Sequence, residues 1–400
     1  MQATRPQPLS PRLAALVARY RAVGVLLLNL LLLLLGLNLL LGIGYALRDA
    51  LSDRTLGPGR KYPESSLAAV YPGLPREERN DLLRETWSRP FLFADYTMFR
   101  ERPFTGKHVN VSPHGFRLVK DQGPWPPDPA HFNVFLFGGS TTFGYGLPDH
   151  QTVASHLQDA LAPLSKRRVC VYNFAAGFYY STQERILLEQ MLSHGHTPHL
   201  ALFIDGLNDG ENPDDQSAHS AKVREVFDHP NRILFLGQGA DRVPVIRLVR
   251  SVAEGVSRAR RQAAPPADAN EEDRRLLQAI SRYQRNKRLI EAACREFSVT
   301  PLFVWQPVPG YEYDLQHHPF ANPARSQRQA LFYGEMRKAM EDPAVQGHFL
   351  WCADLQRTAR EGLYVDGVHY TASFSKQFAE VIGQRAKERG LLGLGLEPEP

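Results

Sequence analysis

Cysteine is scarce in this chain, and that scarcity excludes several classes of protein. Three cysteines in 400 residues rule out a disulfide framework and leave room for one bridge at most. Cys170, Cys294 and Cys352 lie far apart in the sequence and lack the spacing of a metal site. We interpret all three as buried free thiols in strands and helices, and we expect no metal and no cofactor.

An excess of one charge is also missing from most of the chain. The formal net charge is +5. Arg5, Arg12, Arg19 and Arg21 supply +4 of it, with no acidic residue before position 22, so the rest of the chain carries +1. A nearly neutral body lacks the basic surface of a nucleic-acid-binding protein. We therefore expect no nucleic-acid partner.

The sequence does contain one long apolar run. Residues 22–47 read AVGVLLLNLLLLLLGLNLLLGIGYAL and carry no charge, and about 20 such residues span a bilayer as a helix. A buried core helix is one alternative, and a cleaved signal peptide, with an apolar core of about 7–15 residues, is another. The run's length, its Leu on every face and the lack of a cleavage site favour a transmembrane anchor. Asn29 and Asn38 interrupt it, either as tolerated polar residues or as partners of a neighbouring helix.

Charges on the two sides of the run predict its orientation. Residues 1–21 form a basic tail, whereas Arg48, Asp49, Asp53 and Arg54 balance one another. The positive-inside rule then places the tail in the cytoplasm and residues 48–400 outside it. We expect a single-pass protein of the cell inner membrane with an extracytoplasmic, periplasmic main domain.

Beyond the anchor the pattern changes twice. Residues 48–130 are rich in Pro, Gly, Arg and aromatics, which predicts an extension of short strands and turns packed on the main domain. From 131 to 390, short apolar runs alternate with helical segments, and 391–400 form a tail. This alternation predicts an α/β domain with a parallel sheet and helices on both faces. The expected strands are 133–137, 168–174, 199–204, 301–305 and 348–351.

Helices are expected between these strands, at 151–164, 276–297 and 372–389. Another should begin at Ser181, because Glu184 three residues later completes a capping box. The stretch 210–300 is too long for a simple crossover, and its AAPPADANEEDRR segment predicts a surface loop. We interpret it as an insertion, either shaping the substrate entrance or lying neutrally on the surface.

Ser140 follows the first expected strand directly, within FLFGGSTTFGYG. Ligands of open parallel sheets bind beyond the carboxyl ends of the strands, so this serine is placed at the working edge. Taken alone, Gly-Gly-Ser-Thr is also an ordinary turn. A phosphate-binding loop is the other functional alternative, but its lysine is absent.

Two hydrogen-bond donors follow the next two strands. Gly177 in YNFAAGF offers a backbone N–H, and Asn208 in IDGLNDG offers a side-chain amide. Two donors aimed at one point make an oxyanion hole. Taken singly, a turn glycine and a helix-capping asparagine explain them as well.

Asp366 and His369 lie three residues apart in VDGVHYT, between the fifth strand and the last helix. This spacing lets the carboxylate hold one imidazole nitrogen while the other faces a serine as general base. An isolated Asp-x-x-His is most often a surface turn.

The four motifs occur together and in one order along the chain, which favours a functional interpretation of each. GGSTTFG, NFAAG, DGLND and DGVHYT together resemble the SGNH, or GDSL, hydrolase family over about residues 131–388, in the form of its membrane-anchored bacterial members. The resemblance implies a flavodoxin-like sheet of five parallel strands, Ser140 as nucleophile, and Gly177 and Asn208 as oxyanion donors. It also implies that the Asp366–His369 pair completes a triad. Gly139 departs from the family, many members of which have Asp before the serine.

Other candidate sites are weaker. His194, His196 and His199 are close enough for a metal, but a Gly and a Pro within HGHTPH indicate a loop. The acidic run at 209–215 lacks the spacing of a calcium loop, which favours a solvated segment. Gln306 and Tyr311 follow the fourth strand, and we expect them to touch substrate.

These observations predict ester chemistry on an envelope substrate. The first hypothesis is an esterase or O-acyltransferase acting on acyl groups, acetyl above all, of an envelope or exported polysaccharide. A transferase would need a multi-span partner to deliver the acyl donor across the membrane. A lipid-directed esterase of lysophospholipase type is the second hypothesis, and a non-catalytic, membrane-tethered glycan-binding or scaffold protein is the third.

Overall fold

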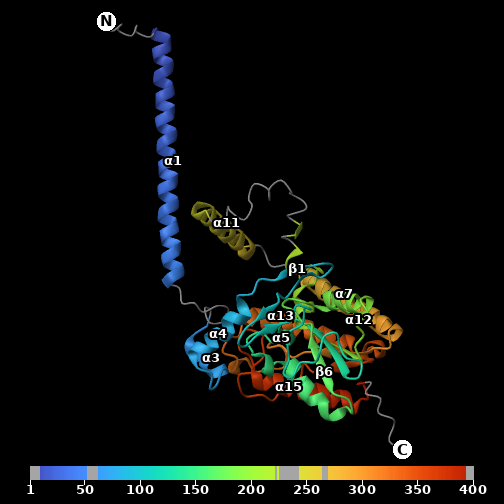
Figure 1. Cartoon of the computed structure of the whole chain (residues 1–400). Helices are drawn as coiled ribbons and strands as arrows, with labels where there is room; N and C mark the ends of the chain where they lie inside the picture. The colour runs from blue at the N-terminus through green and yellow to red at the C-terminus, as the bar shows by residue number, and fades with distance from the viewer. Residues whose placement is uncertain (1–9, 52–61, 221–222, 225–242, 264–268, 393–400) are drawn as a thin grey trace, which may run out of the picture. The chain divides into compact units, whose positions relative to one another are not determined.

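The chain folds as two units. A computed structural model describes residues 10–51, 62–220, 223–224, 243–263 and 269–392 (Figure 1). The first unit comprises Met1–Arg54 and Val223–Pro266, and the second comprises Thr55–Lys222 and Ala267–Pro400. The chain therefore passes from the first unit to the second, back to the first, and again to the second.

The first unit is built on one long helix, α1 (Pro11–Leu51). Its Pro11–Arg48 stretch is long and apolar enough to cross a membrane, and its apolar window is not buried by any other part of the described chain. A second helix, α11 (Pro244–Ala263), lies against α1. There the Val245 N–H donates to Asn38 Oδ1 at 3.2 Å, so Asn38 serves as the partner of a neighbouring helix.

The second unit contains a five-stranded sheet in the order β6-β5-β7-β8-β9, with every pair parallel. This order is the flavodoxin-like one, so the predicted fold class is confirmed. All five expected strands are present, with ends shifted by at most one residue. Their bounds are β5 Phe132–Gly138, β6 Val169–Asn173, β7 Leu200–Asp205, β8 Thr300–Trp305 and β9 Phe349–Trp351.

Alternate strand residues face opposite sides of this sheet, and helices cover both sides (Figure 1). Phe135, Phe203 and Phe303 pack in one core cluster with α7 (Ser181–Ser193), α12 (Ala269–Glu296) and α13 (Pro323–Ala339). Val134 and Leu202 pack in the other with α6 (Val153–Leu161) and α15 (Ala372–Glu388). Continuous apolar runs are required in such strands, because both of their faces are buried. Short elements complete the unit: α5 Ser140–Phe143, α8 Leu207–Glu211, α14 Pro343–Gln346 and the 3-10 turns Asp149–Gln151, Ala162–Leu164 and Leu315–His317.

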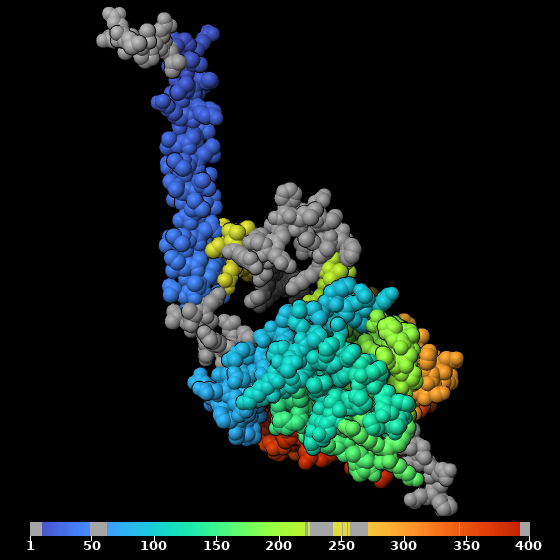
Figure 2. All heavy atoms as spheres, in the orientation of Figure 1, coloured from blue at the N-terminus to red at the C-terminus, as the bar shows by residue number. Residues whose placement is uncertain are grey.

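The extension before the sheet is only partly as expected. Its strands form two antiparallel pairs, β1 (Leu92–Ala94) with β2 (Met98–Arg100) and β3 (Phe104–Thr105) with β4 (Asn110–Val111). Two helices were not predicted, α3 (Glu64–Val70) and α4 (Arg76–Trp87). They are short, and α4 buries Leu82 and Leu83 among many charged residues, so its apolar stripe is narrow. The extension, blue to cyan, covers much of one face of the second unit (Figure 2).

Two local predictions are wrong. Helix α7 begins at Ser181 as predicted, but the capping box does not form: Tyr180 is the N-cap, and its side chain makes no cap hydrogen bond. The Ser181 hydroxyl instead donates to Asp209 at 2.6 Å, and Glu184 is fully buried, because both side chains belong to a polar cluster inside the fold. The surface loop expected at 263–275 is helical from 269 onward as the start of α12, whereas 264–268 lie outside the described residues.

The cysteine interpretation is confirmed. Cys170 lies in β6, Cys294 in α12 and Cys352 directly after β9. All three are buried and free.

The core of the sheet contains a column of phenylalanines whose loss should be costly. Phe203 stacks between Phe137 and Phe303, with ring centroids 4.8 and 5.3 Å apart. We expect Phe203→Ala to lower the free energy of unfolding by about 3–5 kcal/mol, because it leaves a cavity in a closely packed interior. Urea unfolding of the detergent-solubilised chain, followed by tryptophan fluorescence, measures this. Phe93→Ala is the control, since Phe93 is 69% exposed and should change the value by less than about 0.5 kcal/mol.

Candidate active site

Ser140 lies where the chain turns from the end of β5 into the short helix α5. The residue before it has to be small. A Cβ on Gly139 would lie 2.3 Å from Asn208 Nδ2, far inside contact distance. The amide of Asn208 thus occupies the space that a side chain at 139 would need.

His369 connects Ser140 to Asp366. The distance from His369 Nε2 to Ser140 Oγ is 2.8 Å, and the distance from His369 Nδ1 to Asp366 Oδ2 is 2.7 Å. A carboxylate only accepts, so Nδ1–H donates to Asp366, and Nε2 is left to accept the serine proton. The structure thus brings together three side chains from positions 140, 366 and 369 in the arrangement of a Ser-His-Asp triad.

A tight turn holds the Asp366–His369 pair. The Val365 N–H donates to the His369 carbonyl at 2.8 Å, and Tyr364 pairs with Tyr370 in an antiparallel bridge. Asp366 Oδ1 also accepts the backbone N–H groups of Val368 and His369, each at 2.9 Å. Burial by itself raises the pKa of Asp366, but the His369 ring and these donors outweigh it, so its pKa lies below the usual value. Asp366 is therefore an anion that orients the imidazole.

Aromatic rings fix the plane of His369. Tyr145 stacks on the imidazole at 5.4 Å with an interplanar angle of 22°, and Trp87 meets its edge at 5.6 Å. Trp87 comes from the extension and Tyr145 from the segment after Ser140. Two aromatic rings that the sequence analysis had not singled out thus constrain the imidazole of the general base.

Asn208 stands beside Ser140, at the start of α8 directly after β7. One amide N–H of Asn208 donates to the Tyr179 carbonyl at 2.7 Å. A primary amide has two N–H groups, so this bond fixes the side chain and leaves a second donor. Asn208 lines the same cavity as Ser140 and His369.

Gly177 is placed differently. Its N–H donates to Glu101 Oε1 at 3.1 Å, and a Cβ there would lie 2.6 Å from the Tyr145 hydroxyl. The same Glu101 oxygen accepts the Tyr145 hydroxyl at 2.8 Å, and the other oxygen pairs with Arg89 at 3.1 Å. The Gly177 N–H is therefore engaged by a buried carboxylate of the extension, and its oxyanion role stays a prediction.

The triad opens into a cavity of about 360 Å³. Phe178, on its wall, is half exposed and has a φ of +67°, a strained value for a side chain with a Cβ. Glu211 and Arg325 form an ion pair of 2.6 Å in the same wall. The lining residues are Tyr62, Trp87, Ser140, Tyr145, Phe178, Leu207, Asn208, Glu211, Arg325, Asp366, Gly367, Val368 and His369.

The two residues expected to touch substrate do not line this cavity. Gln306 is buried, and its Oε1 accepts the hydroxyls of Thr141 and Tyr370 at 2.6 and 3.0 Å. Tyr311 packs against Tyr333 and Trp351. Both residues follow β8 and so lie at the sheet edge that carries Ser140. The side chain of Gln306, however, points into the fold and holds Thr141, the residue after Ser140.

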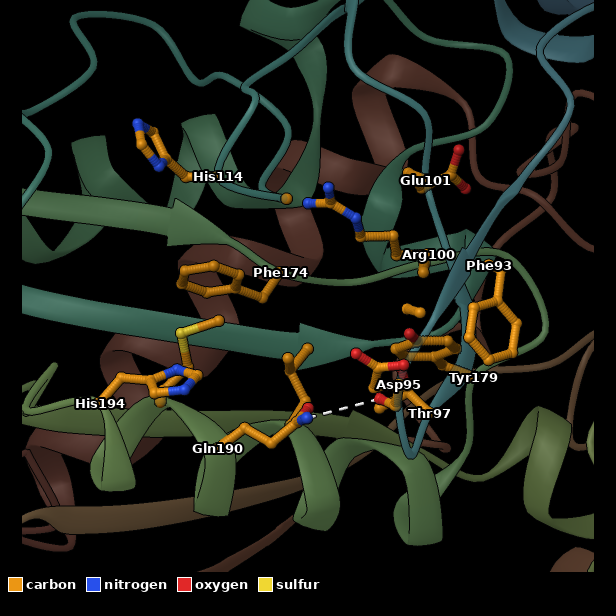
Figure 3. Close-up of a pocket in the computed structure, with 15 residues that line it drawn as sticks. Phe93, Asp95, Thr97, Arg100, Glu101, His114, Phe174, Tyr179, Gln190 and His194 are labelled. Carbon is orange, nitrogen blue, oxygen red and sulfur yellow. Dashed lines mark hydrogen bonds between the residues drawn. The ribbon is translucent and has the colours of Figure 1, made fainter.

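A second cavity, of about 370 Å³, lies between the β1–β2 hairpin and α7 (Figure 3). Phe93, Arg100, His114 and Gln190 are among its lining residues, and Gln190 donates to the Asp95 carbonyl at 3.4 Å. It contains neither Ser140 nor His369. The reactive side chains thus lie in the other cavity, and Glu101, which accepts the Tyr145 hydroxyl, lines only this one of the two.

Two of the three histidines of HGHTPH have structural partners. His199 Nδ1 accepts the Asn133 N–H at 3.0 Å, and His196 packs on Trp125 at 4.7 Å. Among the described residues, no cluster of three or more His, Cys, Asp or Glu side chains is arranged to hold a metal ion. In the acidic run, Asp209 is fully buried, whereas Glu211 pairs with Arg325 at the cavity.

Three acidic residues lie behind Asn208, at the end of β7 and on α7 and α8. Burial raises the pKa of Glu184 and of Asp205 well above the usual value, and Asp209 raises both further. Asp205 also raises the pKa of Glu184, whereas Glu184 partly opposes the rise at Asp205. Burial also raises the pKa of Asp209, although Arg282 and Ser181 oppose it. Folded chains therefore hold protons on this cluster that unfolded chains release.

Known proteins offer likenesses of fold. No protein-family model and no curated protein matches the sequence. Matching solved structures include a lipase/acylhydrolase from Enterococcus faecalis (14% identity, 67% of this chain and 98% of that one, TM-score 0.35). Others are the lipase Lip_vut3 from a goat rumen metagenome (12%, 65% and 99%, 0.39) and the psychrotrophic esterase EstA from Pseudoalteromonas sp. (11%, 65% and 98%, 0.33). At such identities and TM-scores we draw the function from the geometry of the site.

The crowding at position 139 yields a prediction. We expect Gly139→Ala to displace the Asn208 amide and lower kcat for an activated ester about 100- to 1,000-fold, the typical loss for an oxyanion donor. Steady-state kinetics with p-nitrophenyl acetate measures it. Asn208→Ala should give a similar loss, and the double variant little more. Additive losses in the double variant would contradict the shared cause.

The buried acidic cluster yields a prediction about pH. Because Glu184 and Asp205 have raised pKa values, folded chains bind more protons than unfolded ones above the usual carboxyl pKa. The free energy of unfolding therefore falls as the pH rises from the usual carboxyl pKa toward the raised values of the folded chain. Asp366 has a lowered pKa and is ionised in both the folded and the unfolded chain over this interval, so it does not contribute. We expect Glu184→Gln to reduce the loss of unfolding free energy between about pH 5 and about pH 8. Urea unfolding at both pH values tests it, with exposed Glu189→Gln, on the same helix, as control. An unchanged slope in Glu184→Gln would contradict the prediction.

Proposed function

We propose that this chain is a membrane-anchored serine esterase or O-acyltransferase of the SGNH type. The observation that carries the proposal is the continuous contact from Asp366 through His369 to Ser140, at 2.7 and 2.8 Å. An asparagine amide beside the serine and an open cavity in front of it complete the requirements for acyl transfer.

The proposed reaction has two halves. His369 Nε2 takes the proton of Ser140 as Oγ attacks the ester carbonyl carbon, and the second amide N–H of Asn208 stabilises the oxyanion. His369 then donates that proton to the leaving alcohol, which yields an acyl-enzyme. In the second half an incoming hydroxyl gives its proton to His369 and attacks the acyl carbon. The bond from that carbon to Ser140 Oγ then breaks, and His369 returns the proton to Oγ. Water as the incoming group makes the protein an esterase, and a sugar hydroxyl makes it a transferase.

The substrate we propose is a small acyl ester, acetyl above all, on an envelope or exported polysaccharide. Tyr62, Trp87 and Phe178 line a modest cavity, and aromatic rings offer flat apolar surface with polar edges nearby. The Glu211–Arg325 pair adds donors and acceptors for hydroxyl groups. A transferase of this kind would require a donor brought across the membrane, which is the reason to expect a multi-span partner.

We propose further that residues 1–21 lie in the cytoplasm and the catalytic unit on the periplasmic side of the inner membrane. The support is the four arginines before the apolar run 22–47 and the balanced charges after it. Fusing alkaline phosphatase, which matures only outside the cytoplasm, to the C-terminus tests this orientation. An inactive but stable fusion would overturn it.

The triad itself is tested by serine-directed labelling. We expect a fluorophosphonate probe to label the solubilised chain, and Ser140→Ala and His369→Ala to abolish both labelling and acetyl-ester turnover. Asp366→Asn should retain the fold and lose about 10⁴-fold in kcat, because the imidazole then adopts the wrong tautomer. Absence of labelling in well-folded wild type would contradict the proposal.

The same preparations separate the other two functions. Preference for long-chain over acetyl esters would select a lipid-directed esterase. Glycan affinity that survives Ser140→Ala, without any labelling of the wild type, would select a non-catalytic binding or scaffold protein.

A further inference from the structure

Helix α11 of the first unit has one apolar face that is open to its surroundings. Val245, Val249, Val252 and Val256 recur at the three- and four-residue spacing of one helical stripe. Val249 is 61% exposed, Val252 58% and Val256 49%. Exposed apolar stripes of this kind mark a surface made to be covered.

The same helix is strongly basic. It contains five arginines and one glutamate, a net charge of +4. At 100° per residue, Arg247 falls on the side opposite the valines. The chain carries +5 and its first 21 residues +4, so all residues outside these two segments together carry −3. Positive charge is thus concentrated in the first unit, at the tail and on α11.

Contacts within the first unit place α11 beside one end of the apolar run. The Val245 N–H donates to Asn38, and a Cβ on Gly42 would touch Pro244 at 3.5 Å. The Arg247 guanidinium lies over the Tyr45 ring at 4.2 Å. Tyr45 and Arg48 close the apolar run, and tyrosine is characteristic of the level where bilayer meets water. A bilayer spanned by α1 therefore has its surface at the level of α11.

We propose that α11 binds the surface of an anionic lipid bilayer next to the anchor. The valine face enters the boundary between headgroups and acyl chains, and the arginines meet the lipid phosphates. An amphipathic helix with arginine on its polar face has the composition that such binding requires.

Binding of α11 changes how the catalytic unit is attached. The chain leaves the first unit both after α1 and after α11. The catalytic unit then has covalent connections to two membrane-bound helices, which restrict its rotation above the surface more than one tether does.

The experiment places a probe on each face of α11 in the full chain. Val252→Cys and Ser251→Cys introduce single labelling sites, since the three native cysteines are buried. Each variant carries an environment-sensitive nitrobenzoxadiazole dye and is reconstituted through α1 into phosphatidylcholine–phosphatidylglycerol vesicles. We expect blue-shifted emission, quenching by lipids brominated on their tails and protection from aqueous iodide at position 252, and the reverse at 251.

Vesicle composition and a charge variant complete the test. In phosphatidylcholine alone, the lipid quenching at 252 should drop several-fold. In a second pair of variants the dye is attached at Val256→Cys. Adding Val252→Asp should abolish the quenching of this dye by brominated lipids, while α1 keeps the chain in the vesicle. Adding Ser251→Asp is the matched control and should leave the lipid quenching unchanged. Protection of position 252 from both quenchers would mean that protein covers the face, either a second copy or the catalytic unit, and would overturn the proposal. Quenching by iodide alone, or equal quenching in both lipids, would overturn it as well.

Discussion

The buried carboxylate of Glu101 holds together three parts of the second unit that are far apart in the sequence. Its oxygens accept hydrogen bonds from the guanidinium of Arg89, the Tyr145 hydroxyl and the Gly177 N–H. The side chains of Arg89 and Glu101 are only 3% and 2% exposed. A buried charge is tolerated only where partners satisfy it, and removing one partner typically costs about 3–5 kcal/mol. The extension, the segment after the serine and the loop after β6 are therefore interdependent.

This dependence reaches the chemistry through two rings. Tyr145 bonds to Glu101 through its hydroxyl and stacks on His369 through its face, while Trp87 of the extension meets the edge of the same imidazole. The extension thus forms part of the wall that orients the general base. This accounts for the little periodicity of residues 62–130. Their helices and hairpins are stabilised by packing on the sheet, and their side chains serve the site.

The sequence was most informative where one local rule determines the structure. Buried parallel strands require apolar runs on both faces, so all five strands were predicted, as were the free cysteines. Ser140 and Asn208 could be identified because strand ends share an edge, and Asp366 and His369 because they lie three residues apart. The failures arose where tertiary contacts overrode local preference. Ser181 and Glu184 have the spacing of a capping box, yet the Ser181 hydroxyl donates to Asp209 and Glu184 is buried beside Asp205, in the acidic cluster behind Asn208. Glu101 and Trp87 lie in no motif, and only the fold brings them to Gly177 and His369.

The path of the chain between the two units has a consequence for how the catalytic unit is released. Backbone continuity runs from α1 to the second unit, back to α11 and again to the second unit. A protease that cuts once, between α1 and α3, leaves the catalytic unit still joined to α11, which in turn contacts α1 through Asn38 and Tyr45. Shedding of the catalytic unit from a membrane is then resisted by non-covalent contacts even after its first tether is severed.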